Sequence, residues 1–381
     1  MGVSFFYVLA LLPVSIGAFL WCRDKKIVWP EWLLGTAAAL ALAALFHGLS
    51  LWGMVDDNET WSGEITKGIH YPRWVEEYQE SHLETTTDSK GYSQTRYWTT
   101  TEHRTHPEHW EAATSIGNEN NISEGFFKEI CRNFNNYTVE QPYKSGFDSG
   151  DRNIYAAYNR TGFVYPVTGI RHWSNKVKAA PTLFSFAKVP TNIVVYAWPS
   201  NPDWRISDRL LGTAKTYLST LEFDRMNSRL GPIKKVNVIL VGFPSDKGAD
   251  MGHWQQAAWI GGRKNDLVVC FGGGNHVEAP AWVYVFGWSE SAVCKRNLES
   301  LMIGEPLSLS LLSKLEREIT ANYRIKDWTK FDYIRVEPPG WCYWVYFSVL
   351  GITQGLLYVG FHRNKASKGR WYDFGAIFGV D

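Results

Sequence analysis

The stretch Trp32 to Val55 reads WLLGTAAALALAALFHGLSLWGMV, and His47 is its only side chain that can carry a charge. A helix needs about 20 mostly apolar residues to cross the roughly 30 Å of hydrocarbon in a bilayer. This stretch therefore predicts a transmembrane helix. It decides the fold, because every segment on either side of it is then assigned to one face of a membrane.

Two other segments have the same character. Val3 to Trp21 reads VSFFYVLALLPVSIGAFLW, and Trp341 to Phe361 reads WCYWVYFSVLGITQGLLYVGF, with aromatic residues at its start as in an interfacial belt. A signal peptide is the alternative for the first, although its apolar run exceeds the usual length of about 7 to 15 residues and no basic region precedes it. A buried core helix is the alternative for the last. We expect three transmembrane helices, two N-terminal and one C-terminal.

The charges that flank these segments predict their orientation, because Lys and Arg near the ends of a span stay on the cytoplasmic side. Basic residues lie between the first two segments and after the third, whereas acidic residues follow the second. We therefore expect a multi-pass protein of a bacterial inner membrane, with residues 56–340 periplasmic and the C-terminal tail cytoplasmic. The basic residues are Arg23, Lys25, Lys26, Arg363, Lys365, Lys368 and Arg370.

Two polar residues, His47 and Gln354, lie at membrane depth, where such groups raise the question of transport. The predicted spans hold no carboxylate or Lys that would form a relay with them. We interpret both as hydrogen-bonding groups between packed helices. Gly35, Ala39 and Ala43 are four residues apart, so they share one helix face and predict a close contact between helices.

The predicted outer domain has a balanced charge. The chain carries 39 Lys and Arg against 38 Asp and Glu, and residues 56–340 are slightly acidic. This composition excludes the basic footprint of a nucleic-acid-binding protein. The region holds three cysteines, and Cys270 and Cys294 are the candidate disulfide because both lie at the edge of a strand or turn in one subdomain. Two buried free thiols are the alternative.

Residues 56–180 are predicted to form an arm and an irregular connection. A Thr-rich, aromatic sequence surrounds the turn signal Asp88 to Gly91, which predicts one long β-hairpin over Glu64 to Ala112 that reaches away from the core. Aromatic side chains are common in protein interfaces, so the hairpin is the candidate contact element. The candidate interaction residues are Trp74, Tyr78, Tyr92, Tyr97 and Trp98.

The same arm concentrates histidines, which raises the question of a divalent cation. Alternate strand residues face opposite sides, so histidines three apart converge only if the chain bends, and Pro107 could supply a bend. Solvated strand histidines are the alternative. The candidate ligands are His82, His103, His106 and His109.

Residues 181–340 are predicted to form an α/β domain, with a strand over Asn192 to Trp198 and a helix over Arg205 to Phe223 ahead of a β-α-β-β-α unit. A short helix, Glu124 to Phe134, is expected before this domain. Residues 341–381 hold the third span and the tail. The elements of the unit are Val236 to Phe243, Asp250 to Ile260, Leu267 to Phe271, Ala281 to Trp288, and a helix opened by Pro306.

Several short motifs carry a resemblance. The segment Trp259 to Asp266, WIGGRKND, and the entry ETWSG from Glu59 resemble motifs of a family of uncharacterised membrane proteins from tailed phages and their bacterial hosts. Relatives often carry a Cys-rich ribbon where this chain has its hairpin. The β-α-β-β-α unit is also similar in pattern to the TPM domain of membrane-anchored extracytoplasmic proteins, some described as phosphatases and others as modulators of membrane complexes.

The TPM-like pattern raises the hypothesis that Asp246, Asp250 and Asp266 hold a cation that polarises a phosphate ester. Each Asp also fits a helix cap or a turn. Gly272 to Gly274 is interpreted as a hairpin turn, since no Lys-Ser/Thr pair follows it. His253 and His276 lack a nucleophile in any recognisable motif.

Two functions follow from these features. The first is a membrane-anchored interaction or assembly protein without catalysis and without a required cofactor, phage-related, that contacts the bilayer and a protein partner or a second copy. The alternative is a TPM-like, metal-dependent phosphatase at the outer membrane face. The expected fold is α+β, with three transmembrane helices and one extracytoplasmic domain.

Overall fold

The computed structural model describes residues 5–24, 29–87, 90–91, 93–135, 138–143, 152–180, 186–273, 279–334 and 336–368. The chain divides into two compact units. The first comprises Met1–Asp57, His172–Ser185 and Asp327–Asp381, and the second comprises Asn58–Arg171 and Phe186–Lys326. The fold is of the mixed α+β class, with helices and three sheets among the described residues.

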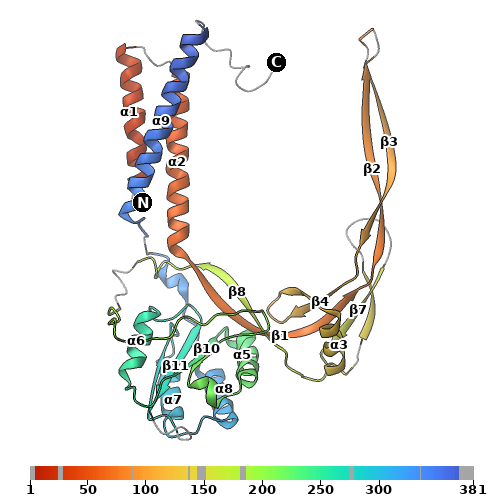
Figure 1. Cartoon of the computed structure of the whole chain (residues 1–381), viewed down its shortest axis with the longest axis vertical. Helices are drawn as coiled ribbons and strands as arrows, with labels where there is room; N and C mark the ends of the chain where they lie inside the picture. Colours follow the sequence, from red (N-terminus) through yellow and green to blue (C-terminus); the bar gives the residue numbers. More distant parts are fainter. Residues whose placement is uncertain are drawn as a thin grey trace. The chain divides into compact units, whose positions relative to one another are not determined.

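Three helices form the main part of the first unit and run side by side (Figure 1). They are α1 (Phe5–Asp24), α2 (Trp29–Val55) and α9 (Gly340–Lys368). Two segments, Pro30–Val55 and Gly340–Gly360, are long and apolar enough to cross a membrane, by length and composition. In α1 the apolar segment among the described residues is Phe5–Gly17, which is shorter.

Small residues of α2 let the helices pack closely, as predicted. Ala39 and Ala43 are fully buried in a cluster with Phe6 of α1 and Tyr346 of α9. The Gln354 amide of α9 donates to the Gly35 carbonyl at 2.9 Å. The structure therefore confirms both the small-residue face and the role of Gln354 as a hydrogen-bonding group between helices. His47 packs instead against the rings of Phe6 and Tyr7, and its Nδ1 has no hydrogen-bond partner among the described residues.

Polar and aromatic residues gather in the first unit next to the end of α2. The Asn175 amide donates to Asp57 at 2.7 Å, and its backbone N–H donates to the Val55 carbonyl at 2.6 Å. Trp173 lies edge-on to Trp328, with 4.7 Å between ring centroids. The acidic exit from α2 is therefore held by residues of the segment 172–178. Trp328 and Asp332 contact this segment in turn.

The second unit begins with an antiparallel sheet in the strand order β5-β4-β1-β7-β6, in which β8 also pairs with β1. Helix α3 (Glu124–Asn133) covers it, and Ser123 caps the helix by accepting from the Phe126 N–H. Gly68 of β1 lets the helix approach, because a Cβ there would lie 3.1 Å from Phe127. The strands are β1 (Asp56–Tyr71), β4 (His109–Thr114), β5 (Glu119–Ile122), β6 (Thr138–Tyr143), β7 (Arg152–Tyr158) and β8 (Pro166–Ser174).

A second sheet has the strand order β12-β11-β10-β9. Strands β9, β10 and β11 are parallel, and β12 is antiparallel to β11, as a hairpin after Gly272 predicts. Side chains alternate along each strand between two buried clusters, so the sheet is covered on both faces. The strands are β9 (Leu210–Gly212), β10 (Asn237–Gly242), β11 (Asp266–Gly272) and β12 (Trp282–Phe286).

Helices cover the two faces unequally. In β10, Val238 and Leu240 face the cluster that holds residues of α5, α7 and α8, whereas Ile239 and Val241 face the cluster that holds residues of α6. The predicted order β10, α6, β11, β12 and a later helix is confirmed, with α7 as an additional helix before α8. The helices are α4 (Ala214–Tyr217), α5 (Thr220–Lys234), α6 (Asp250–Ala258), α7 (Ala292–Met302) and α8 (Leu309–Asn322), and a 3-10 turn, η1, covers Trp328–Phe331.

Three sequence predictions were wrong. The connection after the hairpin is not irregular, because it contains β5, β6, β7 and β8, which pair with the strands of the first sheet. The segment Asn192 to Trp198 is not a strand, because the backbone of Tyr196 pairs with a side chain: its N–H and C=O both bond the Gln255 amide, at 2.9 and 3.0 Å. The stretch Arg205 to Phe223 is not one helix but β9, α4 and the start of α5. Gly212 separates them with a φ of 58°, and a Cβ there would lie 2.1 Å from the Gly242 carbonyl oxygen.

Candidate interaction surface and buried polar cluster

A long two-stranded ribbon extends from the first sheet of the second unit (Figure 1). It consists of β2 (Trp74–Thr87) and β3 (Ser93–His106), which pair antiparallel from Trp74↔His106 to Thr87↔Ser93. Strands β1 and β4 continue the same pairing at its base, where Tyr71 lies opposite His109. The structure thus confirms one long hairpin over Glu64 to Ala112. Of the predicted turn, Lys90 and Gly91 are described, and Gly91 has a φ of 82°.

The register divides the ribbon into two faces, because residues directly opposite one another point to the same side. We call the side with the even-numbered residues the charged face. Here Glu84 lies opposite Arg96, Tyr78 opposite Glu102, and Glu76 opposite Arg104. The full set is Trp74, Glu76, Tyr78, Glu80, His82, Glu84, Thr86, Gln94, Arg96, Trp98, Thr100, Glu102, Arg104 and His106.

The opposite side, which we call the hydroxyl face, has a different composition. Glu77 and His103, which lie opposite one another near the base, are its only acidic or basic side chains among those described. Farther out, Leu83 lies opposite Tyr97, and these side chains are 59% and 73% exposed. Its members among the residues with described side chains are Val75, Glu77, Gln79, Ser81, Leu83, Thr85, Ser93, Thr95, Tyr97, Thr99, Thr101, His103 and Thr105.

The five predicted interaction residues are therefore not one surface. Trp74, Tyr78 and Trp98 lie on the charged face, and Tyr97 lies on the hydroxyl face. Tyr92 falls outside the described residues. Sequence alternation alone could have separated Tyr97 from Trp98, but the pairing register is needed to place Leu83 beside Tyr97.

The four predicted histidine ligands do not converge. His106 stacks on Trp74 at 4.5 Å and bonds Glu76 at 2.7 Å, while His82 bonds the Thr100 hydroxyl at 2.7 Å. His103 lies 3.6 Å from Glu77, and His109 stacks on Tyr71 at 4.5 Å. Each imidazole is thus occupied by its own cross-strand neighbours, and the described residues contain no group of three or more that could hold a metal ion.

The three predicted aspartate ligands are also separated. Asp266 begins β11 beside Asn237, the first residue of β10, whereas Asp246 and Asp250 follow the other end of β10. Six strand residues at about 3.3 Å each put roughly 20 Å between these ends. Asp246 pairs with Lys247 at 3.1 Å, and Asp250 is exposed at the start of α6. The structure therefore does not bring the three carboxylates to one cation.

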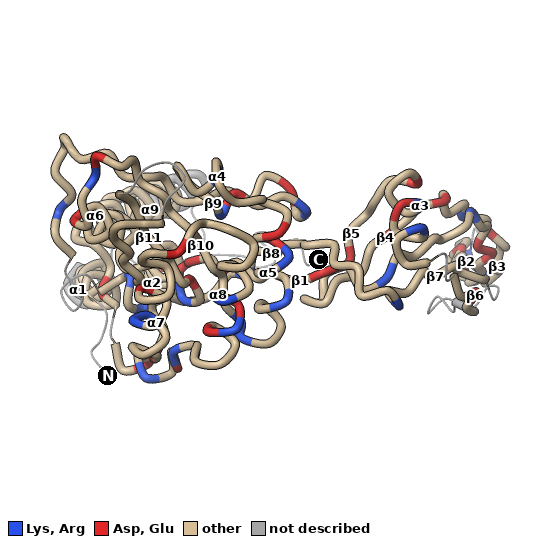
Figure 2. Tube along the Cα trace, turned by 90° about the horizontal axis from the view of Figure 1, so that it is seen from below, with Lys and Arg blue, Asp and Glu red and all other residues tan. Residues whose placement is uncertain are grey.

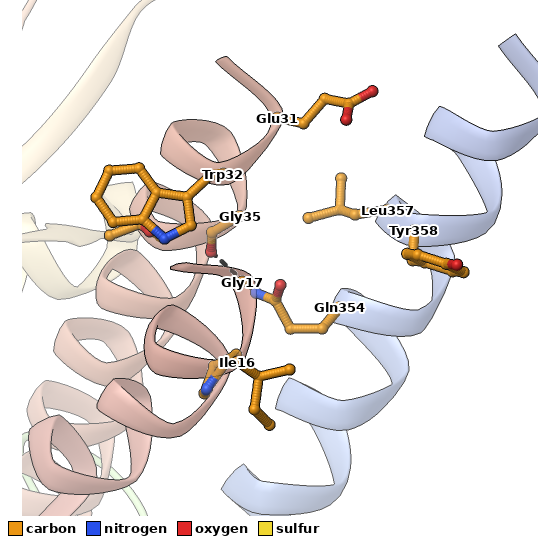
Figure 3. Close-up of a pocket in the computed structure, with 10 residues that line it drawn as sticks. Ile16, Gly17, Glu31, Trp32, Gly35, Gln354, Leu357 and Tyr358 are labelled. Atoms are coloured by element: carbon orange, nitrogen blue, oxygen red, sulfur yellow. Dashed lines mark hydrogen bonds between the residues drawn. The ribbon is translucent and has the colours of Figure 1, made fainter. Parts of the chain in front are cut away.

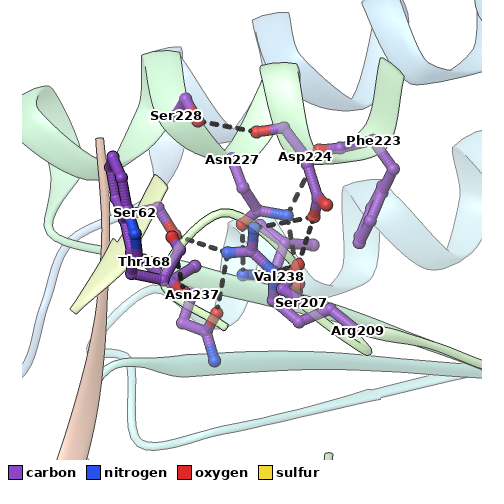
Figure 4. A network of polar contacts seen from close by, with 11 residues as sticks. Ser62, Thr168, Ser207, Arg209, Phe223, Asp224, Asn227, Ser228, Asn237 and Val238 are labelled. Atoms are coloured by element: carbon purple, nitrogen blue, oxygen red, sulfur yellow. Dashed lines mark hydrogen bonds and ion pairs between the residues drawn. The ribbon is translucent and has the colours of Figure 1, made fainter. Parts of the chain in front are cut away.

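A buried polar cluster joins β1 to the second sheet instead (Figure 4). Its centre is Arg209, which is 2% exposed and whose guanidinium donates to Asp224 at 2.8 Å. The same group donates to the side chains of Ser62, Ser207 and Asn237. Burial lowers the pKa of Arg209, and the carboxylate of Asp224 opposes that effect. The cluster ties β1 to α5 and β10.

Asp266 extends this cluster along the sheet edge. It accepts from the Asn237 amide at 2.7 Å and from the Arg263 backbone N–H at 2.9 Å. Burial, reinforced by the Asp266 charge, raises the pKa of the nearby Tyr323 hydroxyl well above its usual value. Asn265 donates to the Thr60 carbonyl at 2.7 Å. The motif quoted from Trp259 to Asp266 thus includes residues that hold β1 against this sheet, a role that no sequence signal indicated.

The predicted disulfide is corrected by the structure. Cys270 and Cys294 are free thiols, because Cys270 of β11 points into the cluster with α6 and Cys294 of α7 packs in the cluster on the opposite face. Burial raises the pKa of Cys294 to about 11, and raises that of Cys270 still further. Both are therefore held as thiols at neutral pH.

Basic and acidic residues are interspersed over α7 and α8 (Figure 2). This distribution differs from the single-sign stripe of a nucleic-acid-binding surface. No protein-family model, curated protein or solved structure matches this chain.

Proposed function

We propose that this protein is anchored in a membrane by three helices, α1, α2 and α9. The helix lengths and the burial pattern support this. Large apolar side chains such as Leu33, Leu49 and Ile352 point away from the bundle and are more than half exposed. Helices that are apolar all round belong in a core or in a bilayer, since water would meet a continuous apolar surface.

The topology that fits best places the N-terminus and residues 56–340 outside and the C-terminal tail in the cytoplasm of a bacterium, in its inner membrane. The basic residues that flank the spans support this orientation. The resemblance to membrane proteins of tailed phages and their hosts supports the bacterial assignment.

Protease accessibility tests this topology. Protease added to sealed, right-side-out vesicles should digest residues 56–340 and leave the tail after His362 intact. Antibody detection of a C-terminal epitope tag before and after detergent permeabilisation supplies the control. Digestion of the tail in sealed vesicles would overturn the three-span arrangement.

We propose further that the ribbon β2–β3 is the contact element of the protein, acting through its hydroxyl face. The observation that supports this proposal most directly is the length and isolation of the ribbon. Each of its two strands has fourteen residues, and among the described residues each strand pairs only with the other. An isolated two-stranded ribbon is marginal in water, so self-stabilisation does not explain its length.

The hydroxyl face suits burial against a protein. Leu83 and Tyr97 form an exposed apolar pair, and the neighbours Ser81, Thr85 and Thr99 are uncharged. Burying a hydroxyl against a hydrogen-bonding partner costs far less than burying a charge. An exposed aromatic and an aliphatic side chain within such a surface form the kind of anchor that carries most binding energy in interfaces. Burial of the charged face would instead remove several charged side chains from water, which costs more free energy.

A matched pair of variants tests this assignment. Tyr97→Glu places a charge on the hydroxyl face, and Tyr78→Glu places the same charge on the charged face. Full-length protein is used to capture partners from native membranes, and its own oligomeric state is measured in detergent. We expect the affinity of association to fall at least about tenfold for Tyr97→Glu, because an unpaired charge would be buried in the interface. It should change little for Tyr78→Glu.

Shortening the ribbon provides a second arm of the test. Replacing Thr85 to Gln94 by a tight turn should leave thermal stability nearly unchanged and reduce association sharply. Unfolding of the shortened protein would identify the ribbon as a structural strand pair. Unchanged association in both the shortened protein and Tyr97→Glu would place the contact surface elsewhere.

A further inference from the structure

The helix bundle encloses a cavity, but its polar groups are used within the chain. The cavity, of about 220 Å³, lies between α1, α2 and α9 (Figure 3). The Gln354 amide donates to the Gly35 carbonyl at 2.9 Å. The Trp32 indole donates to the Val14 carbonyl at 3.1 Å, and Glu31 also interacts within the chain. These groups therefore call for no ligand, whereas the hydroxyl face of the ribbon is open to one.

The hydroxyl face consists of opposite pairs whose two members complement each other. Near the base, Glu77 lies opposite His103, with 3.6 Å between the carboxylate and the imidazole. Farther out, the aliphatic Leu83 lies opposite the aromatic Tyr97. The other described pairs join hydroxyl, amide or aliphatic side chains, without a charge. Each strand therefore carries the groups that suit the other strand.

Such a face is complementary to a second copy of itself. If two hydroxyl faces pack together about a twofold axis that runs along the ribbon, β2 of each copy lies over β3 of the other. Glu77 of one copy then faces His103 of the other, and the contact occurs twice, as in every twofold interface. Leu83 and Tyr97 meet in the same way. Two sheets pack face to face at about 10 Å, which suits these contacts.

The charged face lacks this property. The same axis would place Glu80 over Thr100 of the second copy. It would also place Glu102 over Tyr78, so neither carboxylate would meet a cation. Burial of an unpaired carboxylate is costly. Glutamates also outnumber arginines on this face, so two copies of it repel each other.

We propose that the partner of the hydroxyl face is a second copy of this chain, related to the first by a twofold axis along the ribbon. This inference rests on the membrane anchoring and on the contact function of the ribbon proposed above. Two copies in one membrane have the same orientation, so their twofold axis is normal to the membrane. Their ribbons then run in the same direction, as an axis along the ribbon requires.

The area of the face predicts a contact that depends on the membrane. Fourteen residues at about 3.3 Å each, in two strands about 4.8 Å apart, give a face on the order of 450 Å². Two copies would bury about 900 Å², which is the size of a weak interface. Anchoring in one membrane raises the effective concentration of the second copy, so a weak contact is sufficient for pairing.

Charge pairing between two variants tests the arrangement. Ser81 lies opposite Thr99, and both are exposed and uncharged. Full-length copies that carry donor and acceptor dyes on a C-terminal tag are mixed in liposomes, and energy transfer measures their pairing. We expect Ser81→Glu alone and Thr99→Lys alone to lower the association constant at least about tenfold, because each buries an unpaired charge.

A mixture of Ser81→Glu with Thr99→Lys should restore pairing, because position 81 of one copy faces position 99 of the other. A mixture of Ser81→Glu with Ser81→Lys is the matched control and should not, since these positions do not face each other about this axis. Glu80→Lys, on the charged face, should pair as the parent does. Each variant carries one new charge beside an uncharged neighbour, so the ribbon itself should be little disturbed.

Three results would overturn the proposal: energy transfer in the parent no greater than for unpaired copies, no restoration in the first mixture, or equal restoration in the second. Capture from native membranes separates these failures from failure of the contact function. If the parent does not pair but Tyr97→Glu loses a captured protein, the ribbon contacts a different protein and only the second-copy inference is wrong. If Tyr97→Glu also loses nothing, the contact function is wrong as well.

Discussion

Strand β10 and strand β2 lie in the same compact unit but have opposite surroundings. All residues of β10 are buried, and its side chains alternate between two apolar clusters. Most residues of β2 beyond Glu76 are exposed, and β3 is its only sheet partner among the described residues. Strand pairing is common to both regions, so we expect them to differ in stability through side-chain burial. Substitutions on the exposed ribbon should therefore disturb the fold little, whereas every side chain of β10 is constrained by packing.

The largest expected effect comes from matched Arg→Met substitutions in the two regions. Arg209→Met leaves Asp224 buried without its cation, which should destabilise the protein by about 3–5 kcal/mol. Arg96→Met removes an exposed charge from the ribbon and should change stability by less than about 0.5 kcal/mol. Thermal and urea unfolding of both full-length variants gives the two values. Similar losses would mean that the ribbon is packed as tightly as the sheet.

A second pair of substitutions compares how much an apolar side chain contributes to stability in each region. Leu240→Ala creates a cavity in a fully buried position of β10 and should cost about 2–5 kcal/mol. Leu83→Ala removes a side chain that is 59% exposed, and it should cost well under 1 kcal/mol while weakening association. Unfolding and association are measured on the same preparations. A large stability loss for Leu83→Ala would contradict the assignment of this side chain to a contact surface.

A third pair concerns the sheet that carries the ribbon. Ser123 caps α3 by accepting from the Phe126 N–H at 3.2 Å. Ser123→Ala should therefore destabilise by about 1 kcal/mol, the usual value for a lost N-cap. Ser81→Ala on the ribbon makes the same chemical change at an exposed position and should have almost no effect. If the two variants unfold alike, the cap does not contribute to the stability of α3.

The sequence pattern predicted those elements whose residues follow a single burial pattern along their length. Val236 to Phe243 was recognisable as a buried strand because apolar residues follow one another without interruption, and the short helix predicted over Glu124 to Phe134 is observed as α3. The long hairpin was also predictable, since alternation and a turn signal agree. These features depend on near neighbours in the sequence, so the sequence alone contains them.

The predictions that were wrong concern residues whose roles depend on partners distant in the sequence. The segment around Tyr196 has the composition of a strand, but Gln255 takes its backbone hydrogen bonds. Cys270 and Cys294 are close in sequence, and only the sheet places them on opposite faces. Asp266 was predicted as a ligand from the TPM-like pattern, whereas in the structure it accepts hydrogen bonds from Asn237 and Arg263 at the sheet edge. Such roles require the pairing register, which no local pattern provides.

The smallest expected effect is the pH dependence of Glu64, which lies on β1 where the two sheets of the second unit approach each other. Burial raises the pKa of this carboxyl above its ordinary value of 4.5, and the charge of Arg229 on α5 partly opposes the shift. Because the folded-state pKa is raised, the stability contribution of Glu64 is fully present below about pH 4.5 and is lost as the pH rises through the folded-state pKa.

Glu64→Gln should therefore stabilise the protein slightly at pH 7 and have no advantage at pH 4. The side chain is partly solvated, so the gain is expected to be small and to appear as a modest shift of the unfolding midpoint. Midpoints of the parent and the variant are compared across this pH range, with Glu80→Gln at an exposed position of the ribbon as the control for the substitution itself. If Glu64→Gln destabilised the protein at pH 7, the attraction of Arg229 would outweigh burial, and β1 would be held to α5 by charge as well as by the Arg209 cluster.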